Sequence, residues 1–424
     1  MRRSAAFMLL LALLAGALGG CAQAAPDTAL TFWAMGREGE VVRQLMPQFE
    51  RENPGVHVRV QQLAFTAAHE KLLTGFAGDS LPDLAQLGNS WVPEFVALGA
   101  LAPLDARIKA TPDIDRADFF GGIWDSNVVG GRLYGLPWYI DTRLLFYRRD
   151  LLAKVGYDHP PRDWAEWRAQ MVAIKKLVGP KHFAAFFPLD EYEPLEVLGL
   201  QQPSQMLRDG GRYGNFRSAD FRRALGFYLD IMAAGLAPVA ATNALSNVWD
   251  EFGRGYFSFY VTGPWQIAEL KRRLPADRQN IWMTAPMPGP NGPGASNAGG
   301  SSIVIFARSP RQDAAWKLAT YLARPDIARK FHKLSGDLPA RRSAWATPEL
   351  SESPYAAAFA LQLARTRPTP KVPEWERIGT EMRLVAEAAA HGRMTLDEAV
   401  TEMDRRADAI LAKRRWLLER GRIQ

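Results

Sequence analysis

The sequence predicts a two-lobed α/β protein, and three observations support this prediction. The chain has 424 residues. A single hydrophobic core stops growing at roughly 250–300 residues, so a chain of this length is expected to divide into two lobes. The composition, with 47% hydrophobic and 23% charged residues, is that of a packed globular protein. Strand and helix patterns alternate along the N-terminal part, which is typical of a largely parallel sheet flanked by helices.

The N-terminus has the pattern of an export signal. Two arginines precede an apolar run over residues 7–18, which is too short for a stable membrane-spanning helix. Residues 18–21, Leu-Gly-Gly-Cys, resemble the lipobox at which bacterial lipoproteins are cleaved and acylated. We therefore expect a signal peptide over 1–21 and a lipid on Cys21, the only cysteine in the chain. Cleavage at the small residues 22–24 is the alternative, and it would discard Cys21 and release a soluble protein.

The first elements follow the order strand, helix, strand. Residues 29–33 have the pattern of a buried strand, and apolar residues recur at helical spacing over 41–49. The turn sequence at 53–55, Asn-Pro-Gly, ends this helix. Valines alternate with polar residues over 56–60, which predicts a second strand and completes a βαβ unit.

The same reasoning extends through the rest of the chain. Four prolines and three glycines lie within residues 286–294, which predicts a loop at a crossing or at the surface. Thr395 and Glu398 have the spacing of a capping box at a helix start. We expect further strands at 83–87, 144–147 and 301–306, and further helices at 70–76, 91–98, 167–178, 221–234, 314–322 and through the tail 374–418.

Short motifs spread over nearly the whole chain resemble, in order, those of the solute-binding proteins that serve sugar ABC transporters, including maltose- and trehalose-binding proteins. Each motif alone is weak, because short strings arise by chance, but their shared order is specific. The motifs are Phe49-Glu50, Asn53-Pro54-Gly55-Val56, Leu81-Pro82-Asp83-Leu84, Tyr134-Gly135-Leu136-Pro137-Trp138, Asp150-Leu151-Leu152, Gly263-Pro264-Trp265, Gly299-Gly300, Ala315-Trp316-Lys317 and Gly336-Asp337-Leu338-Pro339-Ala340-Arg341.

The resemblance implies a periplasmic-binding-protein fold of type II. In such a fold two lobes, each with a mixed, mostly parallel sheet flanked by helices, are joined by a hinge. The implied crossings lie near 139–143, 283–288 and 335–339. The expected lobes are 27–140 plus 286–336 and 141–285 plus 337–424. The ligand would lie in the cleft between the lobes, and closure about the hinge would bury it.

A sugar offers apolar C–H faces and a rim of hydroxyls, so its site needs aromatic rings for stacking and polar groups for hydrogen bonds. The resemblance implies that Trp265 stacks on the sugar ring. It also implies that Asp141 bonds sugar hydroxyls, and it matches Arg341 to a family arginine after the third crossing. A hinge salt bridge between Asp141 and Arg143 is the alternative, since buried carboxylates are normally paired.

Further candidates rest on weaker signals. Gly299 and Gly300 would let the backbone approach the ligand closely, or would only permit a turn before a strand. Glu38 and Glu40 stand where the family offers a carboxylate, but a helix N-terminus would favour the same charges. The remaining candidates are Asn89, Ser90 and Trp91, which replace a frequent family aspartate, together with Trp138, Tyr139 and Tyr192.

Other functions are less well supported by the residues. A glycoside hydrolase acting on the same sugars is the main alternative, because an acid/base carboxylate pair would suit such a cleft. The six histidines form no short helical ligand pair, so we expect no metal and no cofactor. Basic residues over 413–422 favour a solvated helix face, and export argues against nucleic acid.

The resemblance also implies the partners. They are a carbohydrate, which we expect to be an α-linked disaccharide such as trehalose or maltose, and the transmembrane permease subunits of an ABC importer. ATP hydrolysis would belong to another subunit, because the chain has no phosphate-binding loop with a lysine. We expect a monomer on the extracytoplasmic or periplasmic side, attached to the membrane only by its lipid.

Overall fold

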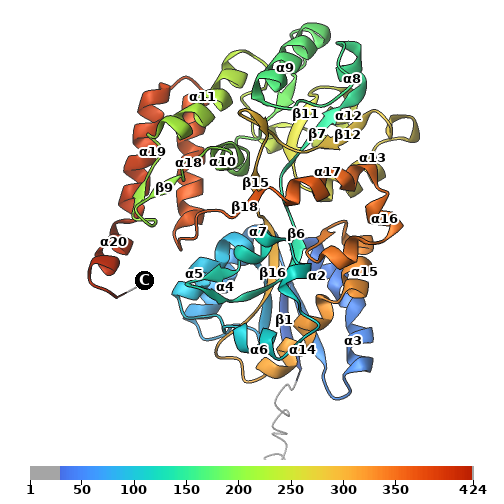
Figure 1. Cartoon of the computed structure of the whole chain (residues 1–424), viewed down its shortest axis with the longest axis vertical. Coiled ribbons are helices and arrows are strands. Elements are labelled where there is room, and N and C mark those ends of the chain that lie inside the picture. The colour runs from blue at the N-terminus through green and yellow to red at the C-terminus, as the bar shows by residue number, and fades with distance from the viewer. Residues whose placement is uncertain (1–28, 423–424) are drawn as a thin grey trace, which may run out of the picture.

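The computed structural model describes residues 29–422, which form two lobes stacked along the long axis of the molecule (Figure 1). The predicted signal peptide over 1–21 and the predicted lipid site at Cys21 lie outside the described residues. Within residues 29–422, no helix combines the length and the apolar character needed to cross a membrane.

The first lobe, lower in Figure 1, is built on a six-stranded sheet with the order β17-β6-β16-β3-β1-β2. β1 pairs in parallel with β2 and β3, whereas β16 runs antiparallel to β3 and β6. The strands predicted at 29–33 and 83–87 are confirmed. The strands are β1 (Leu30–Met35), β2 (Val58–Leu63), β3 (Leu84–Gly88), β6 (Gly135–Ile140), β16 (Gly300–Ile305) and β17 (Leu338–Pro339).

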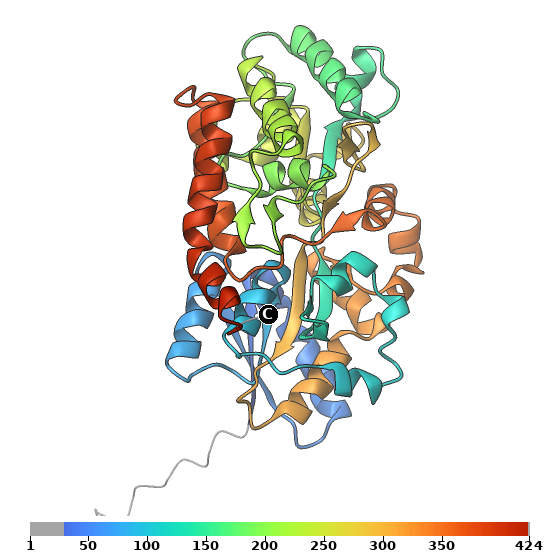
Figure 2. The ribbon, with the colours of Figure 1, turned by 60° about the vertical axis from the view of Figure 1, so that its left-hand side comes forward.

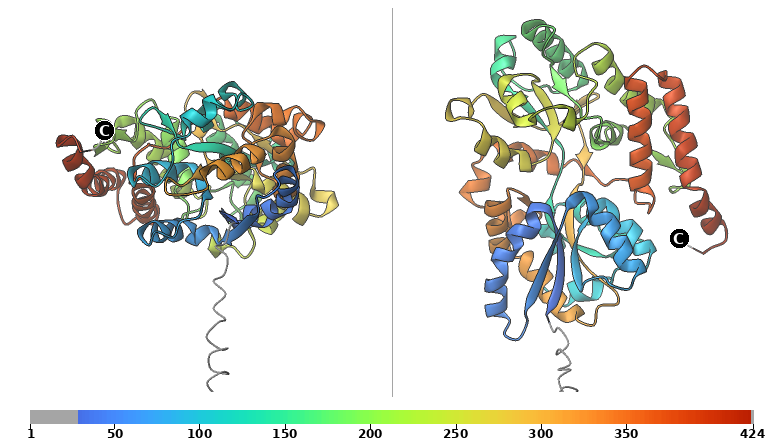
Figure 3. Two further views of the ribbon diagram at one scale, coloured as in Figure 1. Left: turned by 90° about the horizontal axis from the view of Figure 1, so that it is seen from below. Right: turned by 180° about the vertical axis from the view of Figure 1, so that it is seen from behind.

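Helices surround this sheet, as the view from behind also shows (Figure 3). The helix predicted over 41–49 is two helices joined by a single 3₁₀ turn over 43–45. Pro47 lies in the first turn of the second helix, where its missing N–H costs no hydrogen bond. The helices are α2 (Gly36–Val42), α3 (Met46–Glu52), α4 (Phe65–Ala77), α5 (Val92–Ala97), α6 (Asp105–Lys109), α7 (Gly121–Asp125), α14 (Gln312–Leu322) and α15 (Pro325–Ser335).

The second lobe contains a four-stranded sheet with the order β12-β7-β11-β8. Only β11 and β8 pair in parallel. Both sheets are therefore mixed, as expected, but antiparallel pairs outnumber parallel pairs, because strands that return from the other lobe need no crossover helix. The strands are β7 (Leu144–Arg148), β8 (Ala185–Phe186), β11 (Phe259–Thr262) and β12 (Trp282–Ala285).

The tail predicted to be helical is three helices that run along the second lobe and then toward the first (Figure 2). The capping box of Thr395 and Glu398 is confirmed at the start of the middle one. The main helices of this lobe are α8 (Arg149–Lys154), α9 (Trp164–Val178), α10 (Glu193–Leu200), α11 (Ala219–Ala233), α12 (Val248–Arg254), α13 (Trp265–Arg273), α17 (Pro354–Leu363), α18 (Trp375–Ala390), α19 (Leu396–Ile410) and α20 (Ala412–Glu419).

The first passage between the lobes lies at residues 141–143, between β6 and β7. The second lies later than the expected boundary at 286. The loop over 286–294 forms the hairpin β13–β14 (Pro288–Gly289 and Gly292–Pro293), and Gly289 bridges to Asp163 of the second lobe. The chain then passes through β15 (Ser296–Asn297) into β16.

The third passage also lies later than the expected boundary at 337. β17 pairs with β6, and Trp345 donates to the Pro339 carbonyl oxygen, so the chain stays with the first lobe to at least this point. It crosses along α16 (Pro348–Ser351) and returns to the seam as β18 (Thr366–Arg367), which pairs in parallel with β15. The sequence patterns could not reveal these pairings, because a two-residue strand has no periodicity.

One hydrophobic cluster extends across the hinge. It runs from Phe32 and Leu136 through Ile140 to Phe146 and Trp282 in the second lobe. The residues that end β6 and begin β7 are therefore fixed by packing on both sides, which gives the side chains between them a defined position.

Candidate functional site

A cavity of about 170 Å³ lies between the lobes beside the first passage. The first lobe contributes the loop 88–91 and the end of β6, and the second lobe contributes the start of α10. Of the sequence-predicted residues, the structure brings eight together in its wall: Asn89, Ser90, Trp91, Tyr139, Asp141, Tyr192, Gly299 and Gly300.

Arg143 lines this cavity with only 7% of its side chain exposed. Its Nη1 donates to Oδ1 of Asp141 at 2.7 Å. Its Nη2 lies 3.2 Å from Glu193 and 3.7 Å from Glu191. The guanidinium also lies over the indole of Trp265, 4.9 Å from the ring centroid. One cation therefore links the first passage, the start of α10 and the start of α13.

The carboxyl groups around Arg143 are harder to ionise than carboxyls in water. Burial raises the pKa of Asp141 above its ordinary value, and Arg143 only partly opposes this. Burial raises the pKa of Glu191 to about 7. Glu196 is 1% exposed, and its burial raises the pKa of its carboxyl well above the ordinary range. Glu191, with its pKa near 7, can therefore either accept or donate hydrogen bonds near neutral pH.

Glu38 belongs to a second carboxyl pair close to Asp141. Its side chain is a hydrogen-bond partner of Asp337, which is 4% exposed. Burial raises the pKa of both carboxyls, and the charge of each disfavours ionisation of the other. Asp337 lies in the predicted Gly-Asp-Leu-Pro motif, but we had given it no site role. The sequence signal that could have found it was its place beside the predicted third crossing.

Tyr139 is fixed from three neighbouring strands. Gln86 Nε2 donates to its hydroxyl oxygen at 2.8 Å, and the Ser301 hydroxyl contacts the same oxygen at 3.0 Å. Gln86 also accepts from the Met35 amide at 2.7 Å. This buried network holds the ends of β1, β3, β6 and β16 in one arrangement, which makes the floor of the cavity rigid.

Gly299 and Gly300 allow two passages of the chain to touch. A Cβ on Gly299 would lie 2.1 Å from the carbonyl oxygen of Asp141. One on Gly300 would lie 2.3 Å from that of Tyr139, and φ of Gly300 is +124°, which disfavours any side chain. The glycines thus permit close backbone packing at the hinge, in addition to lining the cavity.

Aromatic side chains form the outer wall on the first lobe. The ring centroids of Trp91 and His69 are 4.8 Å apart, and those of Trp91 and Phe65 are 6.2 Å apart. Phe65 is 56% exposed and lines the cavity. On the opposite wall, the Tyr192 hydroxyl donates to Oε1 of Glu376 at 3.2 Å. These rings offer surfaces on which a sugar could stack.

Three predicted residues have other roles. Arg341 does not line the cavity, because it donates to Asp118 at 2.6 Å and to two backbone carbonyl oxygens of the first lobe. Trp138 is a core residue, 3% exposed and packed 4.4 Å from the ring centroid of Phe331. Glu40 is exposed on α2 and lies outside the lining of the cavity. Trp265 is not among the residues that line the cavity, and it contacts the cavity wall through the Arg143 guanidinium over its ring.

Sequence reasoning missed several wall residues. Glu193 and Glu196 follow Tyr192 directly at a helix start, so their position was a usable signal. Glu376 is far away in sequence and joins the site only because α18 packs beside α10, which no local pattern reveals. Across residues 29–422, no cluster of three or more His, Cys, Asp or Glu side chains has the arrangement to hold a metal ion.

Known proteins share this architecture. Residues 34–329 match the profile of the family described as bacterial extracellular solute-binding protein. The structure of the sugar-binding protein MalE from Xanthomonas citri is similar with a TM-score of 0.89 and 52% identity, over 92% of this chain and 99% of that chain. A galactooligosaccharide-binding protein of Bacillus subtilis is 24% identical over 87% of each chain. An uncharacterized lipoprotein of Streptomyces antibioticus is 28% identical over 88% of this chain and 85% of its own length.

Proposed function

The chain belongs to the family of bacterial extracellular solute-binding proteins, and on this premise we propose that it binds an α-linked disaccharide such as trehalose or maltose. The family and the similar structures make it a sugar-binding component of an ABC transporter that works outside the cytoplasm. The identity of the sugar and the residues that contact it are the parts that we propose here.

The observation that carries the proposal is the wall of the cavity beside Asp141. Carboxyl groups, hydroxyls and the Arg143 guanidinium meet there within a rim of aromatic rings. A disaccharide presents hydroxyls that both donate and accept, and apolar ring faces that stack on aromatic side chains. Asp141, Arg143 and Tyr192 would bond the hydroxyls. Trp265 would stack on a ring face once the guanidinium of Arg143 moves toward the sugar.

Delivery would depend on closure of the two lobes. The walls of the cavity come from both lobes, so a sugar that contacts both favours the closed arrangement by its extra contacts there. The permease subunits of the importer would recognise that closed shape. A lipid on Cys21 would keep the protein at the membrane, and the Streptomyces antibioticus relative described as a lipoprotein supports this anchoring. The protein would act as a monomer.

Hydrolysis of the bound sugar is the alternative function. A glycosidase needs one carboxylic acid and one free carboxylate on opposite sides of the bond. Here Arg143 already pairs with Asp141 and lies beside two further carboxyls, which favours binding without reaction. Incubating the protein with trehalose and maltose should leave both sugars intact, and release of glucose would overturn the proposal.

A calorimetric screen over monosaccharides and disaccharides tests the binding function. We expect micromolar or tighter binding of one α-linked disaccharide and a rise in Tm, because a ligand of the folded state stabilises it. Asp141→Asn should weaken that binding, since hydrogen bonds to charged groups are roughly twice as strong as neutral ones. If the wild-type protein binds no carbohydrate, the proposed function is wrong. If Asp141→Asn binds the sugar as tightly as the wild type does, Asp141 is not part of the site.

A further inference from the structure

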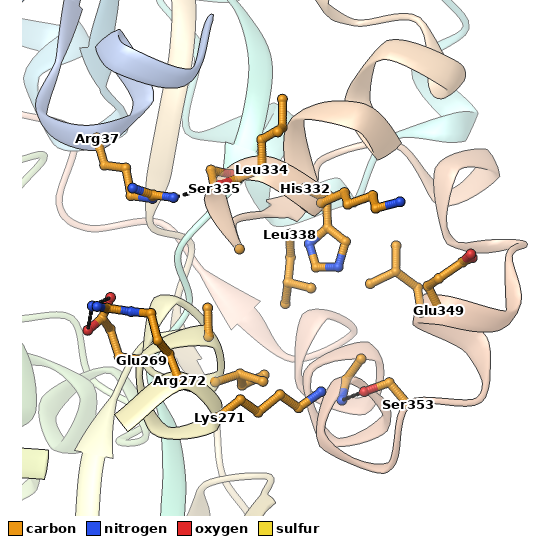
Figure 4. Close-up of a pocket in the computed structure, with 16 residues that line it drawn as sticks. Arg37, Glu269, Lys271, Arg272, His332, Leu334, Ser335, Leu338, Glu349 and Ser353 are labelled. Atoms are coloured by element: carbon orange, nitrogen blue, oxygen red, sulfur yellow. Dashed lines mark hydrogen bonds and ion pairs between the residues drawn. The ribbon is translucent and has the colours of Figure 1, made fainter. Parts of the chain in front are cut away.

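A second cavity, of about 490 Å³, opens between the lobes and shares no lining residue with the first (Figure 4). Arg37 of α2 and the end of α15 form its wall on the first lobe. α13 forms its wall on the second lobe, and residues 349–356 close the side next to the third passage. Figure 4 shows Lys271 along one wall, facing His332 and Leu338 on the other.

The lining of this cavity is rich in cations from both lobes. Arg37 and Lys333 come from the first lobe, and Lys271 and Arg272 come from the second. Two carboxylates are present, Glu269 and Glu349. Positive side chains therefore line the cavity on both sides of the seam.

The carboxylates neutralise only part of this positive charge. Glu269 is already bound by Arg272 and by Arg273, each at 2.6 Å. Arg37 donates to the carbonyl oxygen of Leu334 at 3.1 Å, and Lys271 lies over the ring of Tyr355. Within residues 29–422, no carboxylate lies within ion-pairing distance of Arg37, Lys271 or Lys333.

His332 adds a neutral polar group and no further cation. Its Nδ1–H donates to the carbonyl oxygen of Asp337 at 2.9 Å, and burial lowers the pKa of its ring. A ligand would therefore meet the cations of Arg37, Lys271 and Lys333, which outnumber the one remaining carboxylate, that of Glu349. Ammonium and guanidinium groups are the side chains that bind phosphate and sulfate groups in proteins.

We propose that this cavity binds a phosphate- or sulfate-type anion between the two lobes. Without a ligand, the cations of the two walls repel one another. An anion in the cavity would attract the cations of both walls. Because the walls belong to different lobes, rotation of the lobes changes their spacing. Anion binding is therefore thermodynamically linked to the equilibrium that also sets sugar affinity. The anion acts as an effector that is distinct from the transported sugar.

The first test measures the anion alone, so its result does not depend on the proposed sugar. Isothermal titration calorimetry at constant ionic strength with inorganic phosphate, and separately with sulfate, should show one site on the wild-type protein. The double variant K271Q/K333Q removes one cation from each wall and should bind at least tenfold more weakly. The matched control K181Q/K317Q removes two exposed lysines, one from each lobe, outside both cavities and should bind as wild type does.

Two results of this titration would overturn the proposal. One is an absence of phosphate and sulfate binding at millimolar concentration. The other is an equal loss of affinity in the two double variants, which would indicate general attraction by net charge. Glucose 6-phosphate is the third ligand tested. If it bound while both inorganic anions failed, the cavity would be a site for anionic sugars, and the proposal of a free-anion effector would be refuted.

The second test measures the linkage. The affinity for the transported sugar is determined with and without saturating phosphate, and the affinity for phosphate is determined with and without sugar. We expect a change of about five-fold or more, and linkage requires the two factors to be equal. K271Q/K333Q should abolish the change, whereas K181Q/K317Q should keep it. An unchanged sugar affinity in the wild type would refute a site that joins the lobes.

Discussion

Replacing Arg143 by methionine tests the ion pairs in the wall of the proposed sugar site. Arg143 lies 2.7 Å from Asp141 and 3.2 Å from Glu193, and 7% of its side chain is exposed. Removing one partner of a buried ion pair costs about 3–5 kcal/mol, because an uncompensated charge is left behind. With an unfolding entropy of roughly 2.1 cal/mol/K per residue, this loss corresponds to a fall in Tm of roughly 4–6 °C for a chain of this length.

The loss of stability in Arg143→Met should depend on pH. Without the cation, the carboxyl pKa values in the folded state rise further above their unfolded values. A carboxyl whose folded pKa is raised stabilises the fold while it is protonated, and this contribution is lost as pH rises through the folded pKa. Burial already raises the pKa of Glu191 to about 7 in the wild type. The variant should therefore fall further below the wild type at pH 8 than at pH 5.

Arg148→Met is the matched control for this variant. Arg148 is also buried, lies at the other end of β7 and pairs with Asp150 through two contacts of 2.8 Å. Both variants should lose stability in urea denaturation, but only Arg143→Met should lose at least tenfold in sugar affinity, as expected for a charged hydrogen bond. If Arg143→Met kept full sugar affinity, or lost the same stability at pH 5 and pH 8, the assigned role of Arg143 would be wrong.

Three further substitutions test neighbouring parts of the site. Trp265→Ala should weaken sugar binding by about 1–3 kcal/mol in calorimetry, the scale of a lost aromatic anchor, and an unchanged affinity would exclude stacking. Sugar affinity should vary between pH 6 and pH 8 as Glu191, whose pKa burial raises to about 7, loses its proton. Glu191→Gln should flatten this profile, and an identical profile in the variant would assign the titration to another group. Gly300→Ala should lower Tm, because φ is +124° and the new Cβ would lie 2.3 Å from a carbonyl oxygen, whereas Gly121→Ala, with open space around it, should not. Equal Tm values for the two glycine variants would contradict the close backbone approach.

The sequence alone predicted the helices and strands that have a clear hydrophobic repeat or a capping motif. The valines at 56–60 and the capping box at Thr395 each predicted an element that the structure contains. The lobe boundaries were predicted less well, because they depend on strands of two residues. The loop over 286–294 has the composition of a crossing, yet its hairpin stays with the second lobe through the bridge from Gly289.

The sequence placed a residue in the cavity wall where that residue lies next to a recognised motif. Asp141 and Tyr139 line the cavity because they end a strand whose position the motif marks. Arg341 has the matching residue type, but Asp118, more than two hundred positions earlier, binds its guanidinium. Contacts at such separation have no local signature, and the same is true of the position of Arg143 over Trp265.

The pairing of β15 with β18 determines where the molecule bends. β15 is hydrogen-bonded to its neighbour, and this pairing continues through the Ala298 amide, which donates to the Arg367 carbonyl oxygen at 2.8 Å. We therefore expect the lobes to bend at Gly299, the first residue beyond the pairing. There the Asp141 amide donates to the Gly299 carbonyl oxygen at 3.1 Å, which places the pivot next to the floor of the sugar cavity. Groups close to a pivot move little, so we expect the backbone at Asp141 to keep its position as the lobes turn. Phe65 and Tyr192 belong to different lobes, so we expect the distance between them to change with closure.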